Sequence, residues 1–270
     1  MSWIYLSKKG TDEYINRLAM SAGVTPTVLE TWNYDQDPAA GLVLRGIMKH
    51  KIMKKCWQDH RAFRYVDSGY MGNRPNPQNP QGWKWYHRVV PNDLQHNDLR
   101  KRPADRWEKL GIRPRPHRTD GRDIVVVAPD DKPCQFYGID AERWLADTVD
   151  TIRANTDRPV TVRHRVADPH SRTREPQSSF AAVLAGNTFA VVTYNSIAAV
   201  EAVLAGIPSF VTCPSHAAMP VSNRDLAAID RPWFPDPDLV HEWACHLAYG
   251  QFHIRELEDG TALRILDEDM

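Results

Sequence analysis

The chain has 270 residues, of which 42% are hydrophobic and 25% are charged, and its net charge is zero. These proportions are those of a globular protein with a packed core, and they exclude the disordered, fibrous and membrane-embedded classes. The sequence contains no apolar run near the ~20 residues that span a bilayer and no secretion signal at its start, so we expect a cytoplasmic protein. Its four cysteines are far apart, which argues against a zinc knuckle or a redox pair.

In the first half of the chain, short apolar segments alternate with amphipathic ones. A helix is predicted to begin at Thr11 or Asp12 and to stop at Gly23, and a second, basic helix is predicted at His50–Asp59. Gly69–Gly82, rich in proline and glycine, is predicted to be a long surface loop. The alternation of strands and helices predicts parallel βαβ units. The predicted strands are Trp3–Leu6, Thr27–Trp32, Leu42–Arg45, Phe63–Val66 and Trp83–Val90.

Charge is divided unevenly along the chain. Residues 1–120 contain 21 Lys and Arg against 12 Asp and Glu, and residues 121–270 contain 13 against 22, so the two parts carry +9 and −9. Either the first part binds a polyanion or phosphates, or the two parts attract each other across an interface. A proline-rich basic connector at Arg100–Arg118 is predicted to be a stiff, solvated linker near the boundary between two lobes.

The second half has the element order of a nucleotide-binding domain. The βαβαβ order predicts an open parallel sheet that binds ligands at the carboxyl ends of its strands. An amphipathic segment at Leu239–Phe252 is predicted to form a helix that packs back on a lobe. The predicted strands are Asp123–Ala128, Pro159–Arg163, Phe189–Thr193 and Pro208–Thr212, and the predicted helices are Ala141–Asn155, Phe180–Leu184 and Ile197–Ala205.

The segment after the strand Phe189–Thr193 is the most informative for function. Asn195 and Ser196 stand where they can cap the following helix, whose amide groups and positive dipole end suit a phosphate. Glu201 follows within that helix and can accept hydrogen bonds from ribose hydroxyls. Gly206 then ends the helix. The alternative interpretation is an ordinary strand-helix-strand unit that binds nothing.

The run from Asn195-Ser196 through Glu201 to Gly206-Ile207-Pro208 resembles the donor-site signature of GT-B glycosyltransferases. The resemblance implies an α/β protein with two Rossmann-like lobes facing a central cleft, in which residues 1–115 bind the acceptor and residues 116–270 bind a nucleotide-sugar donor. In that family the serine and the helix amides hold the donor diphosphate, and the glutamate binds the nucleoside. The implied co-substrate is a nucleotide-sugar, by expectation UDP-linked, with no other cofactor. Helix amides and cations can neutralise a diphosphate and a DXD motif is missing, so we expect no metal.

A second segment, Thr161–His170, is similar to the strand and basic loop that contact donor phosphates in bacterial capsule-type GT-B enzymes. The resemblance implies phosphate contacts from Arg163, His164, Arg165 or His170. The compact Lys-Pro-His-Pro order of that family is missing, so either histidine can take the role. A solvated basic loop is the alternative.

Four further positions are candidate site residues. Ser215 and His216 follow the last predicted strand of the sheet, at the edge where ligands bind, although a histidine there is also an ordinary surface residue. Asp67 ends a predicted strand of the first half, where a carboxylate can deprotonate an acceptor hydroxyl. Asp12, beside Lys8 and Lys9, competes for that role. Either aspartate can instead cap a loop.

The acceptor is the least specified part of this hypothesis. The basic first half suits DNA, and the first expectation is a 5-hydroxymethylpyrimidine in DNA, by fold-level analogy with phage enzymes that glycosylate such bases. Its tryptophans equally suit a capsule or cell-wall glycan. A non-catalytic nucleotide- or nucleic-acid-binding protein and a nucleotide-sugar epimerase are the other candidate classes. The sequence lacks Walker A, GxGxxG, HExxH and GxSxG patterns, which argues against the commonest NTPases, dehydrogenases, zinc proteases and serine hydrolases.

Overall fold

The protein consists of two compact units. The computed structural model describes residues 2–47, 50–73, 85–164 and 179–268. The first unit comprises Met1–His96, Arg100–Ile112 and Ala244–Met270, and the second comprises Asn97–Leu99 and Arg113–Trp243. The sequence predicted one division after residue 115. The C-terminal segment instead belongs with the first unit, because its strand hydrogen-bonds to that unit's sheet.

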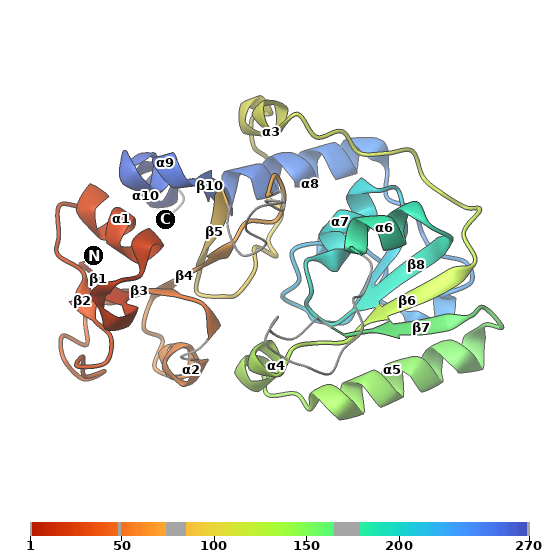
Figure 1. Cartoon of the computed structure of the whole chain (residues 1–270), viewed down its shortest axis with the longest axis horizontal. Coiled ribbons are helices and arrows are strands. Elements are labelled where there is room, and N and C mark those ends of the chain that lie inside the picture. Colours follow the sequence, from red (N-terminus) through yellow and green to blue (C-terminus); the bar gives the residue numbers. More distant parts are fainter. Residues whose placement is uncertain (1, 48–49, 74–84, 165–178, 269–270) are drawn as a thin grey trace. The chain divides into compact units, whose positions relative to one another are not determined.

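The first unit is built on a six-stranded sheet with the order β10-β5-β4-β3-β1-β2 (Figure 1). β1 to β4 are parallel, as the alternation predicted, whereas β5 and β10 extend the sheet in antiparallel fashion at one edge. The strands are β1 (Trp3–Ser7), β2 (Thr27–Val28), β3 (Gly41–Arg45), β4 (Phe63–Ser68), β5 (Tyr86–Pro91) and β10 (Gln251–His253).

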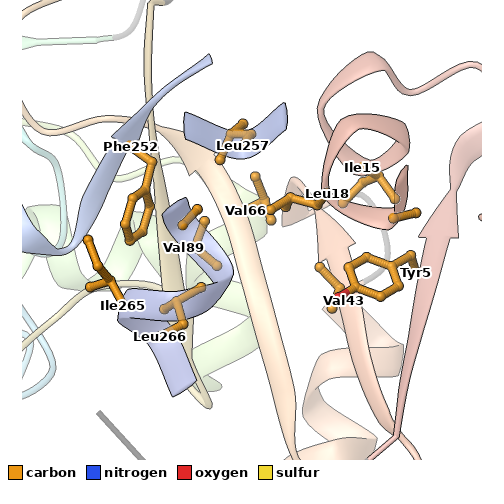
Figure 2. Packing of buried hydrophobic residues seen from close by; sticks show 12 residues of the cluster. Tyr5, Ile15, Leu18, Val43, Val66, Val89, Phe252, Leu257, Ile265 and Leu266 are labelled. Atoms are coloured by element: carbon orange, nitrogen blue, oxygen red, sulfur yellow. The ribbon is translucent and has the colours of Figure 1, made fainter. Parts of the chain in front are cut away.

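Helices from both ends of the chain share the core of the first unit. α1 (Glu13–Ser21) packs with α9 (Ile254–Glu258) and α10 (Thr261–Glu268) against one face of the sheet (Figure 2). Each fully buried Leu, Ile or Phe side chain contributes about 1.5–3 kcal/mol, so the C-terminal segment is part of this unit's stability. The labelled core residues are Tyr5, Ile15, Leu18, Val43, Val66, Val89, Phe252, Leu257, Ile265 and Leu266.

The second unit contains a four-stranded, fully parallel sheet with the order β7-β6-β8-β9. The parallel strands have the same spatial order in both units: β2-β1-β3-β4 in the first unit and β7-β6-β8-β9 in the second. In each unit, the second strand along the chain lies at the edge, next to the first. The order therefore reverses between the first and third strands of each unit, which is where open α/β sheets bind ligands. The strands are β6 (Asp123–Val127), β7 (Val160–Arg163), β8 (Thr188–Thr193) and β9 (Ser209–Val211).

Helices cover both faces of this second sheet. α5 (Ala141–Asn155) lies on one face, and α6 (Phe180–Ala185) and α7 (Ala198–Leu204) lie on the other (Figure 1). Successive strand residues point to opposite faces, so Val126 and Val192 join the α5 core while Val127 and Val191 join the α6 and α7 core. α5, with 15 residues, is the longest helix described, and no helix within the described ranges has the length and apolar character needed to cross a membrane.

The predicted bounds are most accurate for elements that a pattern of apolar residues within the element itself marks. α5 has the predicted bounds, and β6, β7, β8 and α7 agree to within one residue at each end. The strand predicted at Thr27–Trp32 is wrong beyond Val28, because the chain turns there. The helix predicted to reach Phe252 ends earlier: α8 (Pro237–Tyr249) stops before Gly250, and Phe252 lies in β10. A Cβ at Gly250 would lie 2.6 Å from the His96 ring, which accounts for a glycine at this break.

The connector Arg100–Arg118 is mostly exposed, as its composition predicted, but it is bound to the protein and is not a free linker. Its first part forms α3 (Asp105–Leu110), whose Trp107 is buried. Its last part is bound to the second unit, because Arg115 N donates to Leu204 O at 2.9 Å and Arg118 N donates to Gly206 O at 2.8 Å. Gly206 has a φ of +74°, and a Cβ there would lie 2.0 Å from Pro116 O. The glycine that ends α7 is therefore required by the passing connector.

Arg118 also binds the carboxyl end of α6, and this contact generates a prediction. Its guanidinium donates to Leu184 O at 2.6 Å and to Gly186 O at 2.7 Å, where a positive charge also complements the helix dipole. Arg118→Gln should lower the free energy of unfolding by about 1–2 kcal/mol, measured by urea denaturation. The control is Arg122→Gln, because the Arg122 side chain is exposed and bonds only to its neighbour Asp123 among the side-chain contacts described. Equal losses in both variants would contradict this role.

Candidate functional site

The carboxyl edge of the second sheet is defined by one row of paired residues. Arg163 of β7 lies beside Val127 of β6, Val127 lies beside Thr193 of β8, and Thr193 lies beside Val211 of β9. All four strands end in or within one residue of this row, so the loops that follow them begin at the same edge. This is the position at which a parallel α/β sheet binds a ligand.

Arg163 and Glu201, both predicted as donor-site residues, lie within electrostatic reach of each other. Arg163 lies on the α6 and α7 side, with its guanidinium 5.8 Å from the centre of the Phe180 ring. Burial raises the pKa of the half-buried Glu201 carboxyl, and the positive charge of Arg163 opposes that rise. A cation and a carboxylate from different elements thus share one environment beside the start of α7.

The loop between β8 and α7 is braced by its own side chains. Thr193 Oγ1 accepts a hydrogen bond from Ser196 N at 3.2 Å, and Ser196 Oγ accepts one from Ala198 N at 3.3 Å. Ser196 thus bonds to the first amide of α7, but the N-cap position is Ile197, which makes no side-chain cap, so the predicted cap at Ser196 is displaced by one residue. Asn195 is buried, with 9% of its surface exposed. Because the amides of Ser196 and Ala198 already bond within the protein, a donor phosphate would depend more on side chains such as Arg163.

His216 differs from the prediction that it lines a pocket, because it is completely buried. One ring nitrogen lies 2.9 Å from Ser196 O, and the other accepts a hydrogen bond from Ala218 N at 2.9 Å. Ser215 is partly exposed and His164 is exposed. Arg165 and His170 lie outside the described residues.

An aromatic group at the same edge was not identified from the sequence. The Tyr194 ring lies 5.8 Å from the Tyr137 ring and 6.0 Å from the Trp144 ring, and Trp144 Nε1 donates to Thr212 Oγ1 at 2.8 Å. Tyr137 belongs to α4 (Asp131–Tyr137), a helix that follows β6 and was not predicted. The sequence feature that could have indicated this aromatic group is Tyr194, an aromatic residue directly after a buried strand.

A cavity lies elsewhere in this unit. It has a volume of about 410 Å³ and extends beside α6 towards the starts of β6 and β8, and Arg163 is the one predicted site residue in its lining. Its lining mixes polar residues such as Asp123 and Asn187 with apolar ones such as Val183. The strand ends are the better candidate site, because the loops and polar side chains converge there. No group of three or more His, Cys, Asp or Glu side chains suited to a metal ion occurs among the described residues.

In the first unit, Asp12 lies at the switch between β1 and β3. Its Oδ1 accepts hydrogen bonds from Tyr14 N and Ile15 N, both at 3.2 Å, so it caps α1. Its Oδ2 is 3.4 Å from an Arg45 guanidinium nitrogen, which is a long contact. Arg45 stacks over the Tyr14 ring at 4.3 Å, and the centroid of that ring lies 3.8 Å from the centroid of the His87 ring. Arg45, Tyr14 and His87 were not singled out from the sequence.

Asp67, the other predicted base, is the counterion of a buried arginine. Its Oδ2 accepts hydrogen bonds from Tyr65 Oη at 2.6 Å and from Arg88 at 3.1 Å, and its Oδ1 accepts one from Ser68 N at 2.7 Å. Arg88 is 7% exposed and also donates to Ser68 O and Leu94 O. Strand alternation places Asp67 on the face of the sheet opposite to Val66 and the α1 core. The Asp67 carboxylate therefore stabilises the buried Arg88 guanidinium and the end of β4.

The raised pKa of Glu201 predicts how a substitution responds to pH. The folded protein holds a proton on Glu201 more tightly than the unfolded chain does, so this stabilisation is complete below the ordinary pKa of 4.5 and is lost as pH rises through the folded pKa. Glu201→Gln should therefore gain unfolding free energy relative to the wild type between about pH 4 and pH 7. Urea denaturation at both pH values measures this change. Glu142→Gln, at an exposed position of α5, is the matched carboxyl-to-amide control, and an equal gain in both variants would contradict the effect of burial at Glu201.

Comparison with known proteins identifies the fold. No known protein family and no curated protein matches the sequence. The structure is similar to that of KpsC, beta Kdo 2,7 transferase, from Thermosulfurimonas dismutans, with a TM-score of 0.54 and 10% sequence identity over the whole of both chains. KpsC, beta Kdo 2,4 transferase, from the same organism aligns with a TM-score of 0.46 and 9% identity over 90% of this chain and 98% of that chain. The protein is thus an α/β protein with two parallel-rich sheets, and its fold matches the GT-B-like fold of the first of these transferases.

Proposed function

We propose that this protein is a glycosyltransferase that moves a sugar from a nucleotide-linked donor to a hydroxyl group of a glycan. The observation that carries the proposal is the convergence of the four strand ends at one edge of the second sheet, where Arg163 ends β7 and the loop from β8 leads into α7, the helix that bears Glu201. The fold similarity to a Kdo transferase supports the same class of reaction by analogy.

The side chains at this edge suit the parts of a nucleotide-sugar. Arg163 offers a guanidinium whose forked donors match phosphate oxygens. Glu201 offers acceptor oxygens for ribose hydroxyls. The half-exposed Tyr137 ring, held against Tyr194, offers a flat apolar surface for a base. The proposal includes no metal, because Arg163 supplies positive charge where the leaving phosphate develops negative charge.

In the proposed reaction, a carboxylate of the first unit takes the proton from the acceptor hydroxyl. The hydroxyl oxygen forms a bond to the anomeric carbon of the sugar as the bond between that carbon and the phosphate oxygen breaks. The nucleotide leaves with the electron pair of that bond, and Arg163 stabilises its charge. Asp12 is the favoured base, because its Oδ2 has only the 3.4 Å contact with Arg45 described, whereas Asp67 Oδ2 accepts two shorter hydrogen bonds.

We favour a glycan acceptor over DNA because several arginines of the first unit are buried. Arg61 is 8% exposed and donates to three backbone carbonyls, those of Tyr34, Asp37 and Ala40. Arg64 and Arg88 are also buried, at 2% and 7% exposed, and each pairs with an aspartate. Part of the positive excess of the first half is therefore internal and is not available to a DNA backbone.

The test of the function is a donor and acceptor panel read by mass spectrometry. The protein is incubated with UDP-, GDP- and CMP-sugars, including nucleotide-linked Kdo, and either with capsule-type oligosaccharides or with hydroxymethylated DNA. We expect an oligosaccharide whose mass rises by one sugar residue, together with released nucleotide. A mass gain on DNA alone would replace the glycan acceptor by DNA. An altered free donor would identify an epimerase, and no consumption of any donor would contradict the enzyme assignment.

Two matched substitutions distinguish the candidate bases. Asp12→Asn keeps an oxygen that can cap α1, so the free energy of unfolding should change little while kcat falls by about 100-fold or more. Asp67→Asn removes the counterion of buried Arg88, so unfolding should become easier by about 2–3 kcal/mol with kcat nearly retained. Steady-state kinetics and urea denaturation measure both properties. The reverse pattern would identify Asp67 as the base.

A further inference from the structure

The hydrogen-bond ladder between β8 and β9 continues beyond the ends of the two strands. Thr212 N donates to Thr193 O at 3.3 Å, and Cys213 N donates to Tyr194 O at 3.3 Å. The next contact of this series is made by a side chain, because the imidazole Nε2 of His216 lies 2.9 Å from Ser196 O. A histidine thus takes the place of a backbone amide at the point where the β8–α7 loop leaves the sheet.

The surroundings of His216 determine which nitrogen carries the proton. Ala218 N is 2.9 Å from His216 Nδ1, and a backbone amide can only donate, so Nδ1 accepts. Ser196 O can only accept, so Nε2 carries the hydrogen and donates it. The ring is therefore a neutral imidazole in the Nε2–H form.

The segment that carries His216 is itself held firmly. Met219 N donates to His216 O at 2.9 Å, which closes a turn around the histidine. Trp243 Nε1 donates to Ala217 O at 2.7 Å, and both Trp243 and His216 are completely buried. The imidazole is thus a rigid support between the β9 segment and the loop that precedes α7.

We propose that His216 is a positioning residue of the donor site: its Nε2–H holds the Ser196 carbonyl and thereby sets the start of α7, the helix that bears Glu201. This inference rests on the proposed function for its effect on the donor. It replaces the expectation that His216 contacts the donor, since the buried ring acts through Ser196.

Two substitutions separate the two hydrogen bonds of the ring. His216→Gln places an amide NH2 near the position of Nε2 and can still donate to Ser196 O. His216→Asn places an amide oxygen near the position of Nδ1 and can still accept from Ala218 N, but it does not reach Ser196. Both variants replace the buried imidazole ring by a side-chain amide, so a general loss of packing should affect both.

The first measurement is the kinetics of sugar transfer. For His216→Asn we expect the KM for the donor to rise about tenfold, the effect of losing one hydrogen bond, with a smaller change in kcat. For His216→Gln we expect a donor KM within about twofold of the wild type. His241→Asn, at an exposed position of α8, is the control and should leave the donor KM unchanged. Equal KM values for the Gln and Asn variants would overturn the proposal.

The second measurement is amide hydrogen exchange of the β8–α7 loop, made without any donor. Faster exchange at residues 196–199 in His216→Asn but not in His216→Gln would support the positioning role. Equal exchange in the two variants would overturn it. If the wild-type protein uses no donor at all, the proposed function fails, and the exchange comparison still decides whether His216 holds the loop.

Discussion

The parallel pairing of β7, β6, β8 and β9 is the constraint on which the candidate site depends. It places Arg163, Val127, Thr193 and Val211 in one row, so that loops from distant parts of the chain begin side by side. Hydrophobic packing on both faces maintains that register, because a shift of one residue would turn every apolar side chain to the opposite face. The meeting of Arg163 with Glu201 follows from the register and from the short α7, and no local feature of either residue produces it.

Sequence patterns predicted those parts of the protein whose information is local. The apolar run of β6 and the apolar periodicity of α5 can each be recognised from neighbouring residues in the sequence. The bounds of both elements were predicted to within one residue. The three residues of β10 carry no comparable pattern, since their strand state depends on pairing with β5 far away in the chain. The two-lobed α/β fold could therefore be predicted from alternation, whereas the return of the C-terminal segment to the first sheet could not.

In the candidate site, too, the sequence predicted which residues are close along the chain but not how other parts of the chain surround them. Ser196 and Glu201 could be placed near one another because they lie on one strand-helix unit. The burial of His216 could not be predicted, because it depends on Ala218, Trp243 and the β8–α7 loop together. Likewise, a count of charges treats Arg61 and Arg88 as surface cations, although their guanidinium groups bond to carbonyls and a carboxylate inside the first unit.

Gly206 has a consequence for how the second unit can be produced alone. Pro116 passes within 2.0 Å of the space that a Cβ would fill, and Arg115 and Arg118 bond to the end of α7. Residues 113–118 therefore belong structurally with the sheet whose first strand begins at Asp123. A truncated protein that starts at Asp123 would leave the carbonyls of Leu204 and Gly206 without these donors and expose the apolar end of α7. A fragment intended for crystallisation or ligand titration should therefore begin no later than Arg113, where the long continuous part of this unit starts.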